Sequence, residues 1–204
     1  MSTLLEDRDL QPMVIHLRPV VHMTDDEFFD FCRVNRDWRI ERNAEGDVLI
    51  MPPAGGESGS RNAELITQLR VWAKRDSSGV AFDSSTGFRL PDTATRGPDA
   101  AWVRKTRLRT LAPEQKRKFL PLCPDFVVEQ RSPSDRLSVL QEKMREYMEN
   151  GAQLGWLIDP EEKQVFVYRP GARVRRLDYP QKLSGDPVLS GFVLDLSQVW
   201  DPGF

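Results

Sequence analysis

The stretch Asp125-Phe126-Val127-Val128-Glu129 decides the fold, because it is a continuous apolar run that begins and ends on an acidic residue. Such a run without alternating polar positions is typical of a central strand that is covered on both faces. Apolar residues also recur at helical spacing over residues 62–75 and 137–148. The sequence therefore predicts a buried sheet with helices packed against it.

Further elements follow from turn signals and short apolar runs. Thr24 and Glu27 form a capping-box pattern that predicts a helix start, and residues 38–51 predict an N-terminal β-hairpin. The proline- and glycine-rich residues 52–60 are expected to form a loop. More strands are expected at 79–82, 87–90 and 99–103 as a meander, at 154–158 and 164–168 as a hairpin, and at 191–194, with a short helix from residue 111. This order indicates an α+β fold with a mixed sheet flanked by helices.

The length of 204 residues is enough for one compact domain and short for two. We expect an N-terminal arm over residues 1–22 and a single domain over residues 23–204. No apolar run approaches the roughly 20 residues of a membrane span, and two cysteines far apart in sequence indicate a reduced, cytoplasmic protein. No membrane partner and no organic cofactor are expected.

The scarcity of histidine and cysteine limits the chemistry. With two of each, a structural zinc site would need all four at spacings that no zinc motif shows. Both histidines, His16 and His22, lie in the N-terminal arm, which disfavours a catalytic triad. Carboxylate, lysine and arginine chemistry remains.

The net charge of −2 is an average over unlike parts of the chain. Residues 1–60 hold six arginines and no lysine against twelve acidic residues, a net charge of −6. Residues 101–120 hold seven basic residues against Glu114, a net charge of +6. A charge run is usually a solvated face, but a basic segment directly after the strand at 99–103 also suits contacts to a phosphate backbone.

Two acidic residues stand on otherwise apolar strands: Asp99 begins one, and Glu129 ends the central one. A buried carboxylate is costly unless it is paired or binds a cation. Side chains alternate along a strand, so Glu129 and Arg131 are expected on the same face. Two carboxylates with a nearby cationic side chain suit a hard metal ion such as Mg²⁺ and the hydrolysis of a phosphodiester.

A set of motifs in the same order carries a resemblance to a known family. The segments are Gly97-Pro98-Asp99-Ala100-Ala101-Trp102-Val103, Cys123-Pro124-Asp125-Phe126-Val127-Val128-Glu129, Ser132-Pro133-Ser134-Asp135, Lys143-Met144-x-Glu146-Tyr147 and Gly155-Trp156-Leu157-Ile158-Asp159-Pro160. Over residues 24–170 the chain resembles the "Putative restriction endonuclease" family, a branch of the PD-(D/E)xK nuclease superfamily. The resemblance implies a restriction-endonuclease-like core with a divalent metal at the edge of its sheet.

The resemblance also implies the site residues. Asp99 takes the place of the first motif's aspartate, and Glu129 takes the acidic place of the (D/E)xK element, so both are the expected metal ligands for Mg²⁺ or Mn²⁺. Arg131 stands in the lysine place and, as a permanent cation, suits a phosphate contact better than a base. Lys143 on the following helix is the expected substitute. Glu41 resembles the glutamate of the family's first hairpin, and Glu64 is a further candidate for the metal shell.

Several of these residues also have a purely structural interpretation. Asp125 fits the end of a turn, Glu129 and Arg131 fit an ion pair within the fold, and Lys143 fits a solvated helix flank. Trp156 and the other tryptophans are expected in the core.

The leading hypothesis is a metal-dependent endonuclease that hydrolyses DNA, with Lys143 activating water or stabilising phosphate. Backbone contacts are expected from Arg104, Lys105, Arg107 and Arg109, and a homodimer is expected by the resemblance. The alternative is a catalytically inactive module that keeps the fold and binds nucleic acid or a protein partner. A hydrolase of another phosphoester is a third hypothesis.

Overall fold

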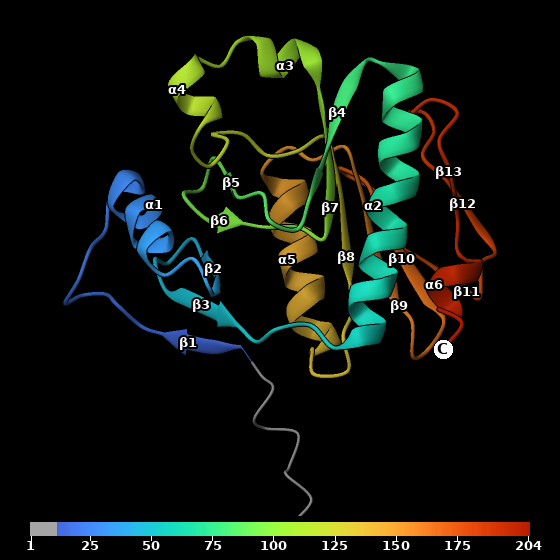
Figure 1. Ribbon diagram of the computed structural model, residues 1–204, viewed down its shortest axis with the longest axis horizontal. Coiled ribbons are helices and arrows are strands. Elements are labelled where there is room, and N and C mark those ends of the chain that lie inside the picture. Colours follow the sequence, from blue (N-terminus) through green and yellow to red (C-terminus); the bar gives the residue numbers. More distant parts are fainter. Residues whose placement is uncertain (1–11) are drawn as a thin grey trace, which may run out of the picture.

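The computed structural model describes residues 12–204, so residues 1–11 of the expected N-terminal arm lie outside the described part. A six-stranded mixed sheet forms the centre of the molecule, a five-stranded sheet lies beside it, and a two-stranded sheet lies near the C-terminus (Figure 1). This arrangement confirms the α+β prediction with a mixed sheet flanked by helices.

The central sheet has the strand order β11-β10-β9-β8-β7-β4. β8 is antiparallel to β7 and parallel to β9, which makes the sheet mixed. Every residue of β8 is buried, as the apolar run predicted. The bounds are β4 (Gly79–Asp83), β7 (Ala100–Arg104), β8 (Phe126–Gln130), β9 (Leu154–Asp159), β10 (Gln164–Tyr168) and β11 (Arg175–Asp178).

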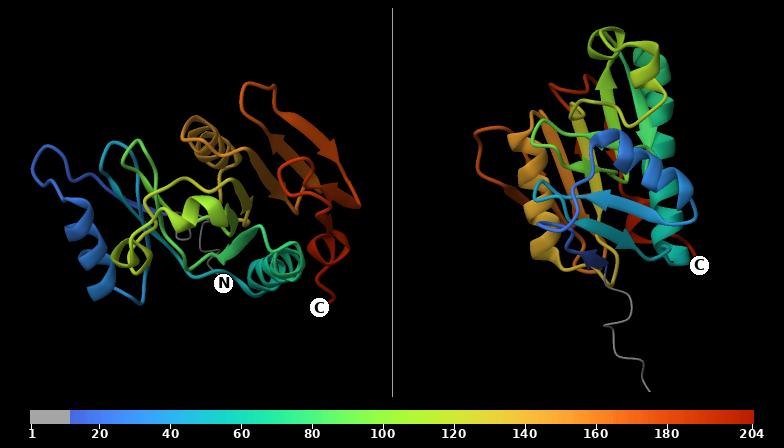
Figure 2. Two further views of the ribbon diagram at one scale, coloured as in Figure 1. Left: turned by 90° about the horizontal axis from the view of Figure 1, so that it is seen from above. Right: turned by 90° about the vertical axis from the view of Figure 1, so that its left-hand side faces the viewer.

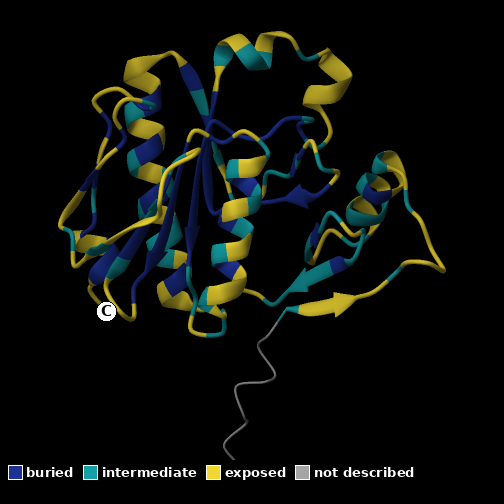
Figure 3. Cartoon of the chain, turned by 180° about the vertical axis from the view of Figure 1, so that it is seen from behind, coloured by how far each residue is buried: buried dark blue, intermediate teal, exposed yellow. Residues whose placement is uncertain are grey.

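Helices cover both faces of this sheet (Figure 2, left). α2 (Gly56–Asp76) and α6 (Ser197–Trp200) pack on one face in a cluster that includes Leu65, Trp102 and Phe126. α5 (Leu137–Glu149) packs on the other face in a second cluster that includes Val127 and Met144. The helices α2 and α5 turn their buried residues toward the sheet and expose the opposite side (Figure 3). The ribbon of β12 (Lys182–Ser184) and β13 (Val193–Asp195) lies near α2 and α6 (Figure 1).

The second sheet has the order β1-β3-β2-β6-β5 and contains the predicted hairpin of β2 and β3. The helix α1 precedes it, and the Thr24–Glu27 capping box is formed as predicted. Two short helices, α3 and α4, follow β7. The bounds are β1 (Met13–Ile15), α1 (Asp25–Val34), β2 (Arg39–Arg42), β3 (Val48–Met51), β5 (Phe88–Arg89), β6 (Thr95–Arg96), α3 (Lys105–Arg109) and α4 (Pro113–Lys116).

Two expectations about these elements are wrong. The helix α2 begins at Gly56 within the expected loop, because the Gly59 amide donates to the Gly55 carbonyl at 2.9 Å and Glu57 pairs with Arg61 at 2.8 Å. The strands after it form no simple meander, since β4 pairs with β7 while β5 and β6 join the second sheet. Within the described part of the expected arm, β1 pairs with β3.

The tryptophans divide into two groups. Trp72, Trp102, Trp156 and Trp200 pack in the cluster under α2, as expected. Trp38, at the start of the hairpin, is 54% exposed, which contradicts the expectation that all five lie in the core.

Candidate active site

The register of β7 and β8 brings the two predicted carboxylates together. Ala100 pairs with Val128 and Ala101 with Val127, so the next position along the pair places Asp99 opposite Glu129. The amide of Gln130 donates to Asp99 Oδ2 at 2.8 Å. Both carboxylates are buried, with 6% of Asp99 and 3% of Glu129 exposed. Two charges so placed require compensation from neighbouring groups.

Lys143 supplies part of that compensation. Its Nζ lies 2.9 Å from Glu129 Oε1 and 2.9 Å from Glu41 Oε1. The three side chains come from α5, β8 and β2, so the helix on one face of the central sheet and the N-terminal hairpin meet here. Lys143 is therefore a buried ion-pair partner and not a solvated helix-flank lysine.

Three residues that the sequence analysis did not select as site residues extend this network: Tyr147, Arg96 and Glu146. The Tyr147 hydroxyl donates to Glu129 Oε1 at 2.9 Å. Arg96 Nη1 lies 3.3 Å from Glu41 Oε2, and its Nη2 donates to Glu146 Oε1 at 3.0 Å. Tyr147 and Glu146 belong to the quoted Lys143 motif, and Arg96 directly precedes the Gly97 motif, so their positions were a usable signal.

The pKa shifts reflect this crowding of charge. Burial raises the pKa of Glu129 to about 7, helped by the negative charges of Asp99 and Glu41 and opposed by Lys143. For Glu41, burial acts in the same direction, but Lys143, Arg96 and Arg39 outweigh it and lower its pKa to about 2. Burial works against the charge of Lys143, yet Glu129 and Glu41 raise its pKa above the usual value. Lys143 is therefore a cation at neutral pH.

Asp99 lines a groove of about 810 Å³, and Arg39 and Asn62 lie beside it in the lining. Arg39 Nη1 is 3.3 Å from Asp99 Oδ1, and Asn62 Nδ2 donates to the same oxygen at 3.4 Å. Asn62 Oδ1 is buried and has no hydrogen-bond partner among the described residues. An unpaired amide oxygen thus lies next to a carboxylate in this groove.

The oxygen donors beside the groove suit a hard cation that needs only one or two protein carboxylates. Among residues 12–204 no group of three or more His, Cys, Asp or Glu side chains is arranged to hold a metal ion. Asp99, Glu129 and the unpaired Asn62 Oδ1 nevertheless offer oxygen donors, and Mg²⁺ commonly takes one or two carboxylates and completes its shell with water and substrate phosphate. Four carboxyl groups and three cationic side chains make up the surrounding network: Glu41, Asp99, Glu129 and Glu146 with Arg39, Arg96 and Lys143.

The other predicted residues lie elsewhere. Arg131 Nη1 lies 2.8 Å from Asp159 Oδ2 and 3.6 Å from Glu161 Oε2, so it pairs with neither Glu129 nor Asp99. Glu64 accepts from Gln68 Nε2 at 2.7 Å on its own helix. Asp125 fits its structural interpretation, because its carboxylate accepts from the Arg104 amide at 2.9 Å.

The basic segment lies at the far end of β7 from Asp99. Asp99 precedes the first residue of this strand, and α3 follows the last (Figure 1). Five residues of extended chain span about 17 Å. Arg104 and Arg107 also pair with Asp125, at 3.7 and 3.2 Å, which leaves Lys105 and Arg109 as the cations of α3 without that carboxylate. The basic residues therefore do not border the carboxylates as the sequence suggested.

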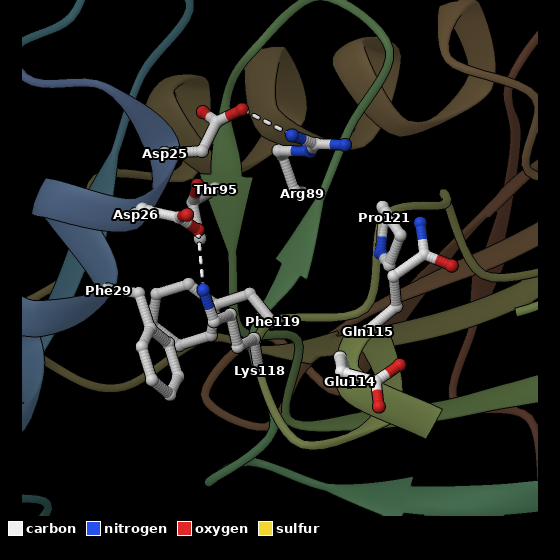
Figure 4. Close-up of a pocket in the computed structure, with 10 residues that line it drawn as sticks. All are labelled: Asp25, Asp26, Phe29, Arg89, Thr95, Glu114, Gln115, Lys118, Phe119 and Pro121. Carbon is white, nitrogen blue, oxygen red and sulfur yellow. Dashed lines mark hydrogen bonds and ion pairs between the residues drawn. The ribbon is translucent and has the colours of Figure 1, made fainter. Parts of the chain in front are cut away.

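A second, smaller cavity of about 200 Å³ lies between α1, β5 and α4 and contains none of the predicted site residues (Figure 4). Four of its charged side chains form two ion pairs, Asp25 with Arg89 and Lys118 with Asp26, and Glu114 is a further charged residue in the lining. The groove is the stronger candidate for an active site, because Asp99 lines it.

The comparisons with known proteins identify the fold and the family. The architecture is restriction-endonuclease-like, and it is similar to the crystal structure of a "putative nuclease belonging to DUF820" from Anabaena variabilis ATCC 29413, with a TM-score of 0.71 at 21% identity over 88% of this chain and 98% of that chain. The family model described as "Putative restriction endonuclease" matches residues 25–197, so the chain belongs to this family. No curated protein matches it. Among residues 12–204 no helix has the length and apolar character needed to cross a bilayer.

Proposed function

We propose that this protein is a metal-dependent endonuclease that hydrolyses DNA phosphodiester bonds, with Asp99 and Glu129 as the metal ligands. The observation that carries the proposal is the meeting of Asp99, which directly precedes β7, with Glu129 of β8 and Lys143 of α5. Of these three residues, Asp99 lines the open groove. Family membership supports the same reaction class.

The cation, Mg²⁺ or Mn²⁺, supplies Lewis-acid activation of water and charge neutralisation at phosphate when it is bound. The chain's own residues do the rest. Lys143 keeps its proton at neutral pH, so it orients water or stabilises developing negative charge and does not accept a proton. Glu41 holds the Lys143 ammonium at 2.9 Å and so fixes its position. Arg39 faces the groove beside Asp99 and is placed to contact a substrate phosphate.

Lys105 and Arg109 remain candidates for contacts to a flanking part of the nucleic acid, about 17 Å from Asp99 along β7. Arg104 and Arg107 are weaker candidates because Asp125 engages both. A homodimer would place two such sites for the cutting of two strands.

The direct test is cleavage of plasmid DNA and short oligonucleotides in Mg²⁺ or Mn²⁺, beside the variants Asp99→Ala and Glu129→Ala. Both variants are expected to lose at least about 100-fold in rate, since each removes a ligand of the activating ion. Circular dichroism and thermal melting verify that they are folded. Cleavage that survives both substitutions would contradict the proposal.

An inactive nucleic-acid-binding module is the second candidate. The observation in its favour is that Lys143 is already neutralised by two buried carboxylates. This candidate requires binding of DNA without metal-dependent turnover in the same assay.

A further inference from the structure

The groove beside Asp99 is unusual for a surface that follows a DNA backbone. Among residues 12–204, Arg39 is the one cationic side chain in its lining, and it already pairs with Asp99. Asp37 and Asp83 add further negative charge to the same lining. A phosphate backbone lying along this groove would meet acidic side chains with little positive charge to offset them.

The rest of the lining is largely apolar: Met13, Trp38, Ile50, Met51, Pro52, Pro53, Ala54, Ala63 and Ile66. Apolar and aromatic walls suit the faces of nucleobases, which lie stacked inside a duplex and become available in an unpaired strand.

Trp38 is the feature of this lining that points most directly to a base. The other four tryptophans pack in the core, whereas Trp38 is 54% exposed in the wall of the groove. Its backbone is held in place, because its amide donates to the Asn35 carbonyl at 3.0 Å and the side chain of the next residue, Arg39, pairs with Asp99. An exposed indole in this lining offers a stacking surface close to the proposed scissile phosphate.

From these observations we infer that the groove takes unpaired nucleotides, with a base stacked on Trp38 and the adjoining phosphate at Asp99. The inference rests on the proposed nuclease function and names its substrate class: single-stranded nucleic acid, or a duplex with an unpaired segment. Lys105 and Arg109 at the far end of β7 would then hold a flanking part of the same substrate.

The first experiment compares cleavage of three substrates of one sequence in Mn²⁺: a single strand, a blunt duplex, and a duplex with an internal unpaired loop. The single strand and the loop are expected to be cut at least about 10-fold faster than the blunt duplex. Equal or faster cleavage of the blunt duplex would overturn the inference and leave the proposed nuclease function intact.

The second experiment measures binding by fluorescence anisotropy of a labelled oligodeoxythymidine of about 15 nucleotides, in a Glu129→Gln background that separates binding from cleavage. Trp38→Ala is expected to weaken binding about 10-fold or more, whereas Trp38→Phe keeps a stacking ring and recovers most of it. Tyr179→Ala is the matched control, since Tyr179 is 53% exposed and does not line the groove.

Unchanged affinity in Trp38→Ala, or an equal loss in Tyr179→Ala, would contradict the inference. Loss of affinity in Trp38→Ala with no cleavage of any substrate would contradict the proposed catalysis and support the base-binding groove.

Discussion

Lys143 is the residue that connects the two halves of the candidate site. It bridges Glu129 of the central sheet and Glu41 of the N-terminal hairpin at 2.9 Å each, and both of these carboxylates are buried. Arg131, which occupies the lysine place of the superfamily motif, instead pairs with the fully buried Asp159. Lys143 and Arg131 therefore pair with different carboxylates. Substituting each residue in turn distinguishes a role in catalysis from a role in stability.

For Lys143→Gln we expect a loss of about 100- to 1000-fold in cleavage rate, because the variant removes the positive charge beside Glu129. For Arg131→Met we expect destabilisation of about 3 kcal/mol, since Asp159 loses its cation, with little change in rate per folded molecule. Urea denaturation measures stability, and activity is normalised to the folded fraction. Arg131→Lys is the control that keeps a cation there. A larger rate loss in Arg131→Met than in Lys143→Gln would assign the lysine role to Arg131.

The sequence predicted Asp99, Glu129, Lys143 and Glu41 as residues of one site, because their motifs and strand positions can be recognised in the chain. The structure places these four residues close together. The sequence did not reveal Arg39, which lies 60 residues from its partner Asp99 in the sequence. It also missed the exposure of Trp38, since a tryptophan beside a strand is usually part of a core. Long-range partners depend on how the two sheets meet, which no local pattern encodes.

The elements of the central sheet are held by close packing that the sequence shows only in part. Gly79 begins β4 directly against the Trp102 indole, and a Cβ built at Gly79 would lie 2.2 Å from Trp102 Cε2. The helix α2 contains a contrasting glycine, Gly59, with nothing within 4 Å of a Cβ at that position. The two glycines therefore predict opposite effects of a methyl group.

Gly79→Ala is expected to destabilise the protein by about 1–3 kcal/mol, because the buried indole must move. Gly59→Ala is expected to stabilise it by up to about 1 kcal/mol, since alanine lowers the entropic cost of the helix without a clash. Chemical denaturation of both variants checks the signs. A neutral Gly79→Ala would show that Trp102 is not tightly held.

Long periodic elements were predictable, and short connections were not. The β2–β3 and β9–β10 hairpins and helix α5 follow the predicted pattern, because hydrophobic periodicity and turn signals specify them locally. β6 and α3 are two and five residues long and exist through contacts with other segments. The early start of α2 depends on a first turn that the glycines alone would disfavour.

Over the molecule as a whole, the basic helix α3 lies away from the carboxylates of the candidate site. α3 lies beyond one end of β7, and Asp99 precedes the other end (Figure 1). The sequence showed the basic segment but not this separation. Residues that are close in sequence lie at opposite ends of β7, because the strand is extended. Nucleic acid that reaches both places must cover about 17 Å.

Neutralising Lys105 and Arg109 together, as Lys105→Gln with Arg109→Gln, is expected to weaken DNA binding and reduce the slope of log affinity against log salt by about 1.4–1.8. The control pair is Arg173→Gln with Arg175→Gln, two exposed arginines that change net charge equally. An equal reduction in both pairs would reveal a general effect of charge and not a contact surface at α3. Filter binding over a range of salt concentrations gives the slopes.

The central claim is that Asp99 and Glu129 together bind a divalent cation, and calorimetric titration of Mn²⁺ into the metal-free protein tests it most directly. We expect saturable binding to the unsubstituted protein, and a loss of at least about 10-fold in affinity in Asp99→Asn and in Glu129→Gln. Arg131→Lys, on the separate Asp159 pair, should bind as the unsubstituted protein does. Equal Mn²⁺ affinity in all four proteins would contradict the account.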